Sequence, residues 1–292
     1  VLAMRQLAPR DDGFRLTAVA QLPYEGGELL RLDDPARRVD ADGVQLYERD
    51  GTRFLHPVGT AQYALAALAG YHRTGDGEYL RRARANAEAL LGTARTHEDA
   101  IFFPYPFDFP LGDEVDNTIH APWYSGMAQG QALSLFVRLW EVDHDQRWRT
   151  AADRTFRSFE VERGPGHPWV TLTDDERHVW FEEYAGDTEP LLVLNGHNFA
   201  LYGLYDYHRV TGSEDAARLF SEGATTVRDE LAGFRVPGGV SYYCLQLPGC
   251  RRPLWQNPKY HAIHAEQLAA LADITDDPWF AERAAEFRAD HS

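Results

Sequence analysis

The pattern of apolar and polar positions changes character near residue 58. Before it, short apolar segments separated by Gly and Asp are typical of strands and turns: FRLTAVA (14–20), ELLRL (28–32), VQLYER (44–49) and TRFLHP (52–57). From Val58 onward apolar residues recur at i, i+3 and i+4, as in GTAQYALAALAGY (59–71) and NFALYGLYDYH (198–208), which predicts amphipathic helices. We therefore expect a β-rich N-terminal segment, 1–57, followed by a helical domain, 58–292.

The helical part contains an internal repeat. A helix ends, a polar turn follows, and an aromatic or apolar residue opens the next helix, at intervals of about 65–70 residues: HRTGDGEYL (72–80), EVDHDQRWR (141–149), HRVTGSEDAARL (208–219) and ADITDDPWF (272–280). This repeat predicts four helical hairpins, at 58–94, 125–160, 194–232 and 260–290. Because one hairpin cannot bury its own apolar stripe, the hairpins must stack or close into a ring. We expect a mainly α fold, an (α/α) toroid of about four hairpins with a small N-terminal β element.

Long linkers connect the predicted hairpins at one end of such a ring, at 95–124, 161–193 and 233–259. Loops of this length in a compact domain are usually functional, and these are rich in aromatic residues, Gly and Pro. The stretches IFFPYPFDFP (101–110) and HAPWYSG (120–126) predict an aromatic lining for the apolar faces of sugar rings. The alternative is that these aromatic residues belong to the core and seal the ring.

Three tyrosines lie at the junctions between helices. Tyr184 is near the end of the second linker, Tyr242 is inside the third, and Tyr260 opens the last hairpin, so we expect them to meet in one cavity. Glu183 adds a carboxylate beside Tyr184. A phenol can move a proton, and together with a carboxylate this set suggests proton abstraction from a carbon beside a carboxylate, as in uronic acids. For each tyrosine alone, a buried core residue with a bonded hydroxyl is the alternative.

Composition excludes some classes of function. The net charge of −16 argues against a nucleic-acid partner, and no basic tract is present to bind an anionic membrane. No apolar run approaches the roughly 20 residues of a membrane-spanning helix, and no signal peptide is visible. Lys259 is the only lysine among 29 basic residues, an arginine bias that suggests a GC-rich bacterial genome. The two cysteines, Cys244 and Cys250, are expected to be free thiols, with a disulfide, and hence an oxidising compartment, as the alternative.

Several stretches resemble the C-terminal domain of the D-glucuronyl C5-epimerases, which convert D-glucuronate to L-iduronate within heparosan-type chains. The matching stretches, which keep the family's order and spacing over about 58–290, are APWYSGMAQGQALSLFVRLWEV (121–142), EEY (182–184), VLNG (193–196), GLYDY (203–207), the Tyr242 segment and KYHAIHAEQLAAL (259–271). The resemblance implies an (α/α) barrel, a uronic-acid-containing oligo- or polysaccharide as substrate, no cofactor, and a homodimer.

The resemblance also implies catalytic roles for individual residues. By motif match the family's glutamate and tyrosines fall on Glu183, Tyr184, Tyr242 and Tyr260, with Glu183 and Tyr260 expected on opposite faces of C5. This sequence departs from the family in the third linker, where YYCLQ (242–246) replaces a YDLRH-like segment. Leu245 stands where an arginine is expected, and Tyr243 competes with Tyr242 for the matching position.

Eight further residues are candidates for substrate binding: Trp123, Tyr124, Gln129, Asn195, Arg251, Arg252, His261 and His264. Arg251 and Arg252, with Lys259, form the basic cluster that could offset the acidic chain where a uronate sits. Asn195 could instead cap a helix that begins near 196, and His261 and His264 could be structural. These histidines do not have zinc spacing and no third ligand is in view, so no metal is expected. Calcium at LGDEVDN (111–117) is less expected than a solvated acidic loop.

Three functions fit these residues. The first is C5 epimerisation of glucuronate residues. The second is a polysaccharide lyase, which begins with the same proton abstraction and then expels the 4-O substituent. The third is an inactive carbohydrate-binding protein. A glycoside hydrolase is disfavoured because it needs two carboxylates at a set separation, and the linkers offer only Glu183 clearly.

Overall fold

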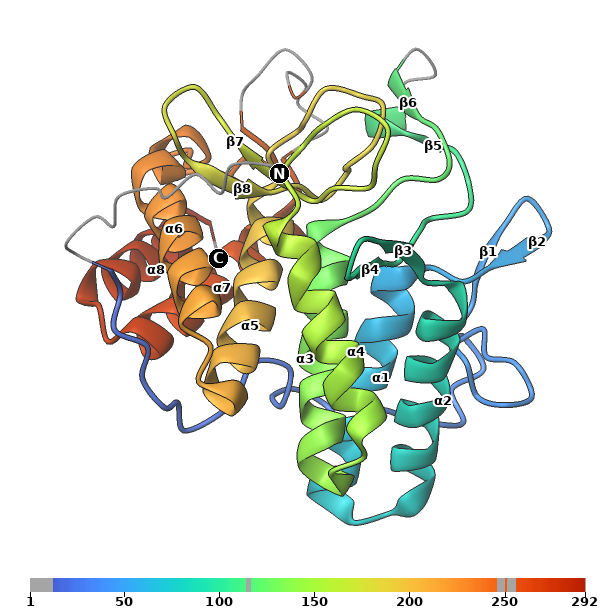
Figure 1. Cartoon of the computed structure of the whole chain (residues 1–292). Coiled ribbons are helices and arrows are strands. Elements are labelled where there is room, and N and C mark those ends of the chain that lie inside the picture. Colours follow the sequence, from blue (N-terminus) through green and yellow to red (C-terminus); the bar gives the residue numbers. More distant parts are fainter. Residues whose placement is uncertain (1–12, 114–116, 246–249, 251–255, 292) are drawn as a thin grey trace.

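The computed structural model describes residues 13–113, 117–245, 250 and 256–291, and in these ranges the chain is mainly helical (Figure 1). The helices form four consecutive hairpins, as the repeat predicts: α1 (Pro57–Thr74) with α2 (Gly77–Thr93), α3 (Gly126–Asp143) with α4 (Gln146–Phe156), α5 (Leu194–Thr211) with α6 (Glu214–Glu230), and α7 (Pro258–Thr275) with α8 (Pro278–Asp290). None of the described helices is long and apolar enough to cross a membrane.

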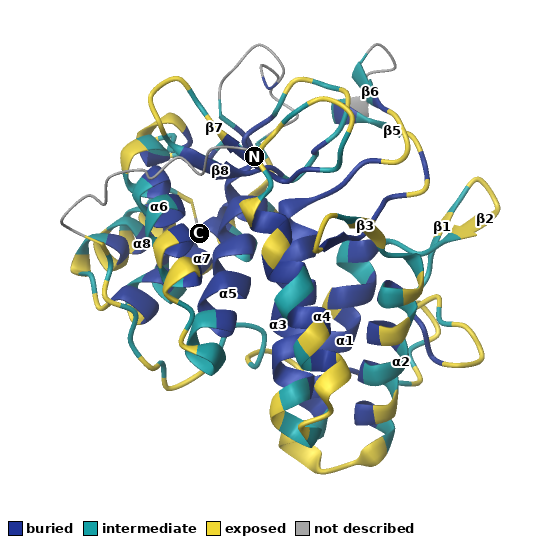
Figure 2. Ribbon diagram, in the orientation of Figure 1, coloured by how far each residue is buried: buried dark blue, intermediate teal, exposed yellow. Residues whose placement is uncertain are grey.

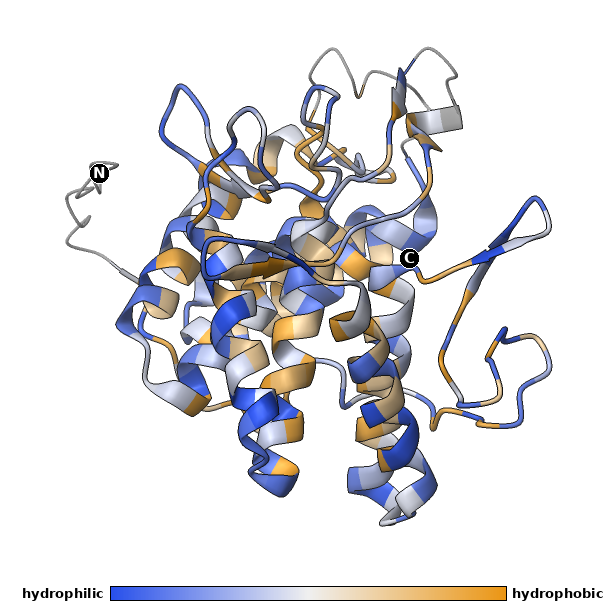
Figure 3. Cartoon of the chain, turned by 45° about the vertical axis from the view of Figure 1, so that its right-hand side comes forward, coloured by the Kyte–Doolittle hydropathy of each residue, from blue (hydrophilic) through white to orange (hydrophobic). Residues whose placement is uncertain are grey.

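The odd-numbered helices form the inner layer of an (α/α) toroid. α1 packs on α3, α3 on α5 and α5 on α7, and each is covered by its own hairpin partner. Figure 2 shows α3 and α5 as almost continuously buried, whereas α2 and α4 expose one face. Apolar residues gather on the faces where the helices meet, and the lower turns are hydrophilic (Figure 3). The predicted fold class is confirmed.

The inner helices α3 and α5 approach each other closely where they cross. A β-carbon on Gly130 would lie 2.6 Å from the carbonyl oxygen of Phe199, and one on Gly203 would lie 2.6 Å from the Cα of Gly130. Both positions therefore require glycine, because any side chain would force the two helices apart. These are the glycines of the WYSGMAQGQ and GLYDY stretches, so part of that sequence pattern records helix packing.

Short antiparallel hairpins fill the linkers. β1 (Tyr47–Arg49) pairs with β2 (Thr52–Phe54), β3 (Arg95–His97) with β4 (Ala100–Phe102), β5 (Phe109–Pro110) with β6 (Thr118–Ile119), and β7 (Thr171–Thr173) with β8 (Val179–Phe181). Figure 1 shows β5 to β8 together above one end of the helices. The linkers therefore gather at one end of the toroid, as expected.

The N-terminal segment differs from the prediction. Of the four expected strands, only those near 44–49 and 52–57 are present, as β1 and β2, while the segments 14–20 and 28–32 contain no strand. Their backbone binds helices instead of a neighbouring strand. The backbone N–H of Thr17 donates to the carbonyl oxygen of Ile274 at the end of α7 (2.8 Å), and Arg73 at the end of α1 donates to the carbonyl oxygen of Gly27 (3.1 Å). The stretch 17–27 thus bridges the first and last inner helices.

The third linker contains a disulfide bond between Cys244 and Cys250. The prediction of two free thiols is therefore wrong. The short loop brings the two Cα atoms to 6.0 Å, which is a usual separation for bridged cysteines. Cys244 also pairs through its backbone with Val193, directly before α5. The bridge therefore lies beside the linkers that carry the candidate site residues.

Candidate active site

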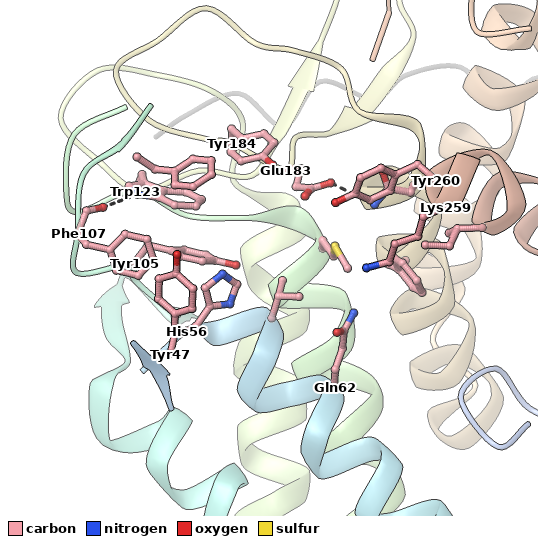
Figure 4. A pocket seen from close by; sticks show the side chains of 16 residues that line it. Tyr47, His56, Gln62, Tyr105, Phe107, Trp123, Glu183, Tyr184, Lys259 and Tyr260 are labelled. Atoms are coloured by element: carbon pink, nitrogen blue, oxygen red, sulfur yellow. Dashed lines mark hydrogen bonds between the residues drawn. The ribbon is translucent and has the colours of Figure 1, made fainter. Parts of the chain in front are cut away.

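A cavity of about 500 Å³ lies at the linker end of the toroid (Figure 4). All four inner helices and the linkers contribute side chains to it. The lining residues are Tyr47, His56, Val58, Gln62, Tyr105, Phe107, Phe109, Trp123, Met127, Glu183, Tyr184, Asn195, Phe199, Lys259, Tyr260 and Ile263. Among them are Glu183, Tyr184 and Tyr260, which the sequence analysis places in one cavity.

Glu183 is presented by a loop that follows β8. The neighbouring Glu182 is fully buried, and its carboxylate accepts backbone N–H groups from Tyr184 (2.9 Å) and Leu192 (2.9 Å). A buried carboxylate that accepts several N–H groups holds the two ends of a loop together. Because Glu182 points into the protein, the adjacent Glu183 side chain is directed toward the cavity.

The first turn of α5 forms the surface against which Glu183 packs. A β-carbon on Gly196 would lie 2.8 Å from the Cβ of Glu183, so only glycine leaves room for this carboxylate. Asn195 Nδ2 donates to Glu183 Oε2 at 3.5 Å, while Asn195 Oδ1 is buried without a partner in the described structure. Asn195 lies inside α5, whose N-cap is Val193, so it lines the cavity and does not cap the helix.

Tyrosine hydroxyls connect to Glu183 in a chain. Tyr243 donates to Glu183 Oε1 at 2.9 Å, and the hydroxyls of Tyr184 and Tyr243 are 3.0 Å apart. Since an ionised carboxylate can only accept, Tyr243 gives its proton to that bond and accepts from Tyr184. The third linker thus contributes Tyr243, and not the expected Tyr242.

The extended backbone of the third linker explains why Tyr243, and not Tyr242, contacts Glu183. Tyr242 pairs through its backbone with Gln256, and Cys244 pairs with Val193. Successive side chains of an extended segment point to opposite sides. Tyr243 is therefore buried beside Glu183, whereas Tyr242 is half-buried on the opposite side of the segment, and neither is among the residues that line the cavity.

Tyr260 and Lys259 enter the cavity from the first turn of α7. Asn257 caps this helix by accepting the backbone N–H of Lys259 at 2.9 Å. The Tyr260 ring lies 4.6 Å from the ring of Tyr243, centroid to centroid, and its hydroxyl has no hydrogen bond within the described residues. The Lys259 ammonium lies 5.9 Å from the Tyr260 ring. Within the described residues, a phenol without a hydrogen bond and a cation without an ion pair therefore lie together at this edge of the cavity.

Burial shifts the pKa values of Glu183 and of the neighbouring tyrosine hydroxyls. It raises the pKa of Glu183 to about 7, an effect that the Tyr243 hydrogen bond opposes and the nearby Glu182 reinforces. Burial, and then the charge of Glu183, also raise the pKa of the Tyr184, Tyr243 and Tyr260 hydroxyls above the usual value of a phenol. At neutral pH the carboxylate is therefore the group that can take a proton, and the phenols are the groups that can give one.

An aromatic wall forms the other side of the cavity. Trp123 stacks on Tyr105 with ring centroids 3.7 Å apart, and its indole N–H donates to the carbonyl oxygen of Phe107 (2.8 Å). Phe109 stacks in turn on Tyr184, at 6.1 Å. The first linker therefore supplies the aromatic lining expected from its sequence, and Trp123 is a buried part of it that stacks on both Tyr105 and Tyr184.

Two candidates for substrate binding, Tyr124 and Gln129, are not among the residues that line the cavity. The Gln129 amide is buried and bonds the backbone of Ile101 and Phe103 (2.8 and 3.0 Å). Tyr124 packs edge-on against Phe102 and does not line the cavity. Both therefore hold the β3–β4 linker against α3, which explains their place beside the WYSG stretch.

The two histidines of α7 are also structural. His261 Nδ1 accepts the backbone N–H of Ser241 (3.0 Å), while its Nε2 lies 2.7 Å from the carbonyl oxygen of Phe287 in α8. His264 Nδ1 lies 2.9 Å from the Ser241 hydroxyl. The pair thus fixes the strand-like segment that carries Tyr243. Arg251 and Arg252 lie outside the described residues, as does part of the 111–117 loop.

Other cavity residues were missed by the sequence analysis. Tyr47, His56 and Gln62 come from the N-terminal part of the chain, where HP (56–57) reads as the end of a strand. The signal was present, because a polar residue directly before proline is a usual helix start, and α1 begins at Pro57 with His56 as its N-cap.

One group of side chains in the described structure has the arrangement of metal ligands. It comprises Glu176, His178 and Glu230, whose ligand atoms lie within 4.8 Å of one another. None of the three lines the cavity. The residues that do line it include a single carboxylate, Glu183, and the cavity therefore offers no comparable set of ligands.

Comparison with protein families gives the same assignment as the motifs. The family model described as "D-glucuronyl C5-epimerase C-terminus" matches residues 95–289, about two-thirds of the chain. The chain belongs to the D-glucuronyl C5-epimerase C-terminus family. The matched region contains Glu183, Tyr184, Tyr243 and Tyr260, but not the cavity residues of β1 and α1.

Two curated relatives support the family. A D-glucuronyl C5-epimerase of Caenorhabditis elegans is 25% identical over 167 residues, which cover 53% of this chain and 26% of that protein. An uncharacterized protein of Methanocaldococcus jannaschii is 28% identical over 209 residues, which cover 68% of this chain and 63% of that protein. The chain thus spans less than two-thirds of the length of either relative.

A solved structure supports the architecture. The cellobiose 2-epimerase of Bacillus thermoamylovorans superposes with a TM-score of 0.58 at 12% identity, over 86% of this chain and 66% of that one. At this identity the likeness concerns the fold alone. It agrees with the (α/α) toroid of inner and outer helices described above.

Proposed function

We propose that this protein catalyses C5 epimerisation of D-glucuronate to L-iduronate residues in a glucuronate-containing glycan. One observation carries the proposal: the cavity of a C5-epimerase-family domain places a carboxylate with a pKa of about 7 among protonated tyrosines. An acid and a base with separated pKa values are what proton exchange at a weakly acidic carbon requires. The aromatic wall and Lys259 suit a sugar ring that carries a negative charge.

The proposed reaction begins with Glu183 as the base. Its carboxylate takes the C5 proton, and the electron pair left behind moves into the adjacent carboxylate to form an enediolate. Lys259 offsets the added negative charge. The Tyr260 hydroxyl then returns a proton to C5 from the opposite face, which inverts the carbon. Protons exchanged with solvent restore Glu183 and Tyr260.

Tyr184 and Tyr243 support the base in this scheme. Their hydrogen-bonded chain ends on Glu183 Oε1, so it orients that oxygen and stabilises the ionised carboxylate. Among the described residues, Glu183 Oε2 has only the long hydrogen bond from Asn195 (3.5 Å), and it is the oxygen we assign to the C5 proton. The assignment of Tyr243 in place of Tyr242 belongs to this proposal.

A polysaccharide lyase is the second candidate. Elimination uses the same first step, so it is consistent with Glu183, but it breaks the bond to the 4-O substituent instead of returning a proton to C5. A glycoside hydrolase fits less well, because two carboxylates must flank the glycosidic bond and Glu183 is the only one among the described lining residues.

Incubation with a heparosan-type polysaccharide in D₂O tests the proposal. Nuclear magnetic resonance should show deuterium at C5 and the appearance of L-iduronate, with no change in chain length. Glu183→Gln serves as the control and should show neither. Ultraviolet absorbance from an unsaturated uronate would establish the lyase instead, and the absence of both deuterium and chain cleavage would refute an enzyme of either kind on this substrate.

A further inference from the structure

His56 stands on the cavity wall formed by the part of the chain that precedes the matched family region. It is the N-cap of α1, and its Nδ1 accepts the backbone N–H of Gly59 at 3.0 Å. Its ring lies among three aromatic rings, with centroid distances of 5.2 Å to Tyr47, 4.9 Å to Tyr105 and 6.1 Å to Phe107. The backbone contact and the three rings together fix how the imidazole is oriented.

The contact with Gly59 also fixes the tautomer. A nitrogen that accepts an amide hydrogen carries no proton of its own, so the proton of a neutral His56 is on Nε2. This Nε2 has no hydrogen-bond partner among the described residues. It is also accessible to solvent, because it is not among the fully buried polar atoms that lack a partner. The cavity-lining His56 therefore offers a pre-oriented N–H donor that no group of the described residues accepts.

Burial keeps this donor neutral. It lowers the pKa of His56 to about 4, so the imidazole carries no charge at neutral pH and does not act as an acid or a base there. Figure 4 shows His56 across the cavity from Lys259 and Tyr260. A ligand in the cavity thus meets a cation and a phenol on one side and a neutral N–H donor on the other.

We propose that His56 binds the uronate carboxylate of the substrate through its Nε2–H and donates more strongly to that group as the enediolate forms. This inference rests on the proposed epimerisation, in which negative charge accumulates on the carboxylate oxygens after the C5 proton leaves. A donor held in place before the reaction stabilises such charge without reorganisation. The conformation of His56 serves both purposes, because the bond that caps α1 is the one that directs the proton to Nε2.

His56→Asn separates binding from helix capping. Asparagine is a good N-cap, so it can accept the Gly59 N–H as histidine does, but its side chain is too short to place a donor where Nε2 lies. We expect C5 deuterium exchange to fall by about 10²–10³-fold, the usual loss for one such donor, with unchanged thermal unfolding. His144→Asn is the matched control, since His144 is a left-handed C-cap outside the cavity where asparagine is tolerated.

Exchange at the wild-type rate in His56→Asn would overturn the proposal and leave His56 as a helix cap only. A second measurement does not depend on turnover. In protein labelled with ¹⁵N-histidine, a glucuronate-terminated oligosaccharide should shift the Nε2 resonance of His56, and that of buried His264 should not move. If wild-type protein shows no exchange, the proposed function fails, and the His56 resonance still decides: a shift retains it as a carboxylate-binding residue, and no shift refutes it.

Discussion

Glu183→Gln should make the protein more stable at alkaline pH. The pKa of Glu183 is raised from 4.5 to about 7 in the folded state, so the folded protein holds this proton more tightly than the unfolded chain. The stabilisation from that proton is complete below pH 4.5 and is lost as the pH rises through 7. The difference of 2.5 pH units corresponds to about 3 kcal/mol, at about 1.4 kcal/mol per unit. Glutamine cannot ionise and avoids this loss.

Urea unfolding followed by circular dichroism at several values between pH 4.5 and 8.5 measures the effect. The difference in unfolding free energy between Glu183→Gln and wild type should be small at the acidic end and grow by up to about 3 kcal/mol at the alkaline end. Titrating groups distant from Glu183 are common to both proteins and cancel, whereas the coupled Glu182 titrates as part of the measured effect. Glu189→Gln, at a side chain that is 87% exposed, should give a flat difference. A flat difference for Glu183→Gln as well would refute the buried, charge-destabilised carboxylate and, with it, the proposed base.

Further outcomes concern activity and are measured as C5 deuterium exchange. Wild-type exchange should rise with pH through about 7 as Glu183 loses its proton, and a pH-independent rate would contradict its role as base. Tyr260→Phe should lower exchange by about 10²–10⁴-fold without changing the helical circular dichroism, and near-wild-type exchange would exclude Tyr260 as the acid. Tyr243→Phe should slow exchange while Tyr242→Phe leaves it close to wild type; the reverse order would restore the motif-based assignment. Gly196→Ala should displace the Glu183 side chain and cost about 10²-fold, and unchanged exchange would show that this contact does not position the base.

The helical repeat was predictable because its period is set by packing. Each inner helix must bury a stripe along its whole length, so the i, i+3, i+4 spacing and the turns predict all four hairpins to within a few residues. The N-terminal strands were not predictable in the same way. Segments such as 14–20 bury apolar side chains against helices distant in sequence, and alternation alone does not reveal which partner satisfies the backbone.

The candidate site could be predicted from the sequence only in part. Glu183, Tyr184 and Tyr260 were found because they lie at the junctions between helices and match the motifs of the family that the sequence resembles. Tyr242 and Tyr243 differ by one position in an extended segment, and a shift of one residue reverses which side chain lies beside Glu183. That choice depends on the backbone pairing of Cys244 with Val193, a contact between two linkers that no local pattern records.

The stretch 17–27, which bridges α7 and α1, bears on the order of folding. Its hydrogen bonds join residues far apart in the sequence: Thr17 binds Ile274 of α7, 257 positions later, and Tyr205, 188 positions later. Long-range contacts form late because loop closure must first be offset by other interactions, whereas each hairpin joins neighbouring residues. During synthesis the partners of this stretch in α5 and α7 are made long after its partner in α1. We therefore expect the four hairpins to associate first. The N-terminal stretch should bind across α1 and α7 as the last step.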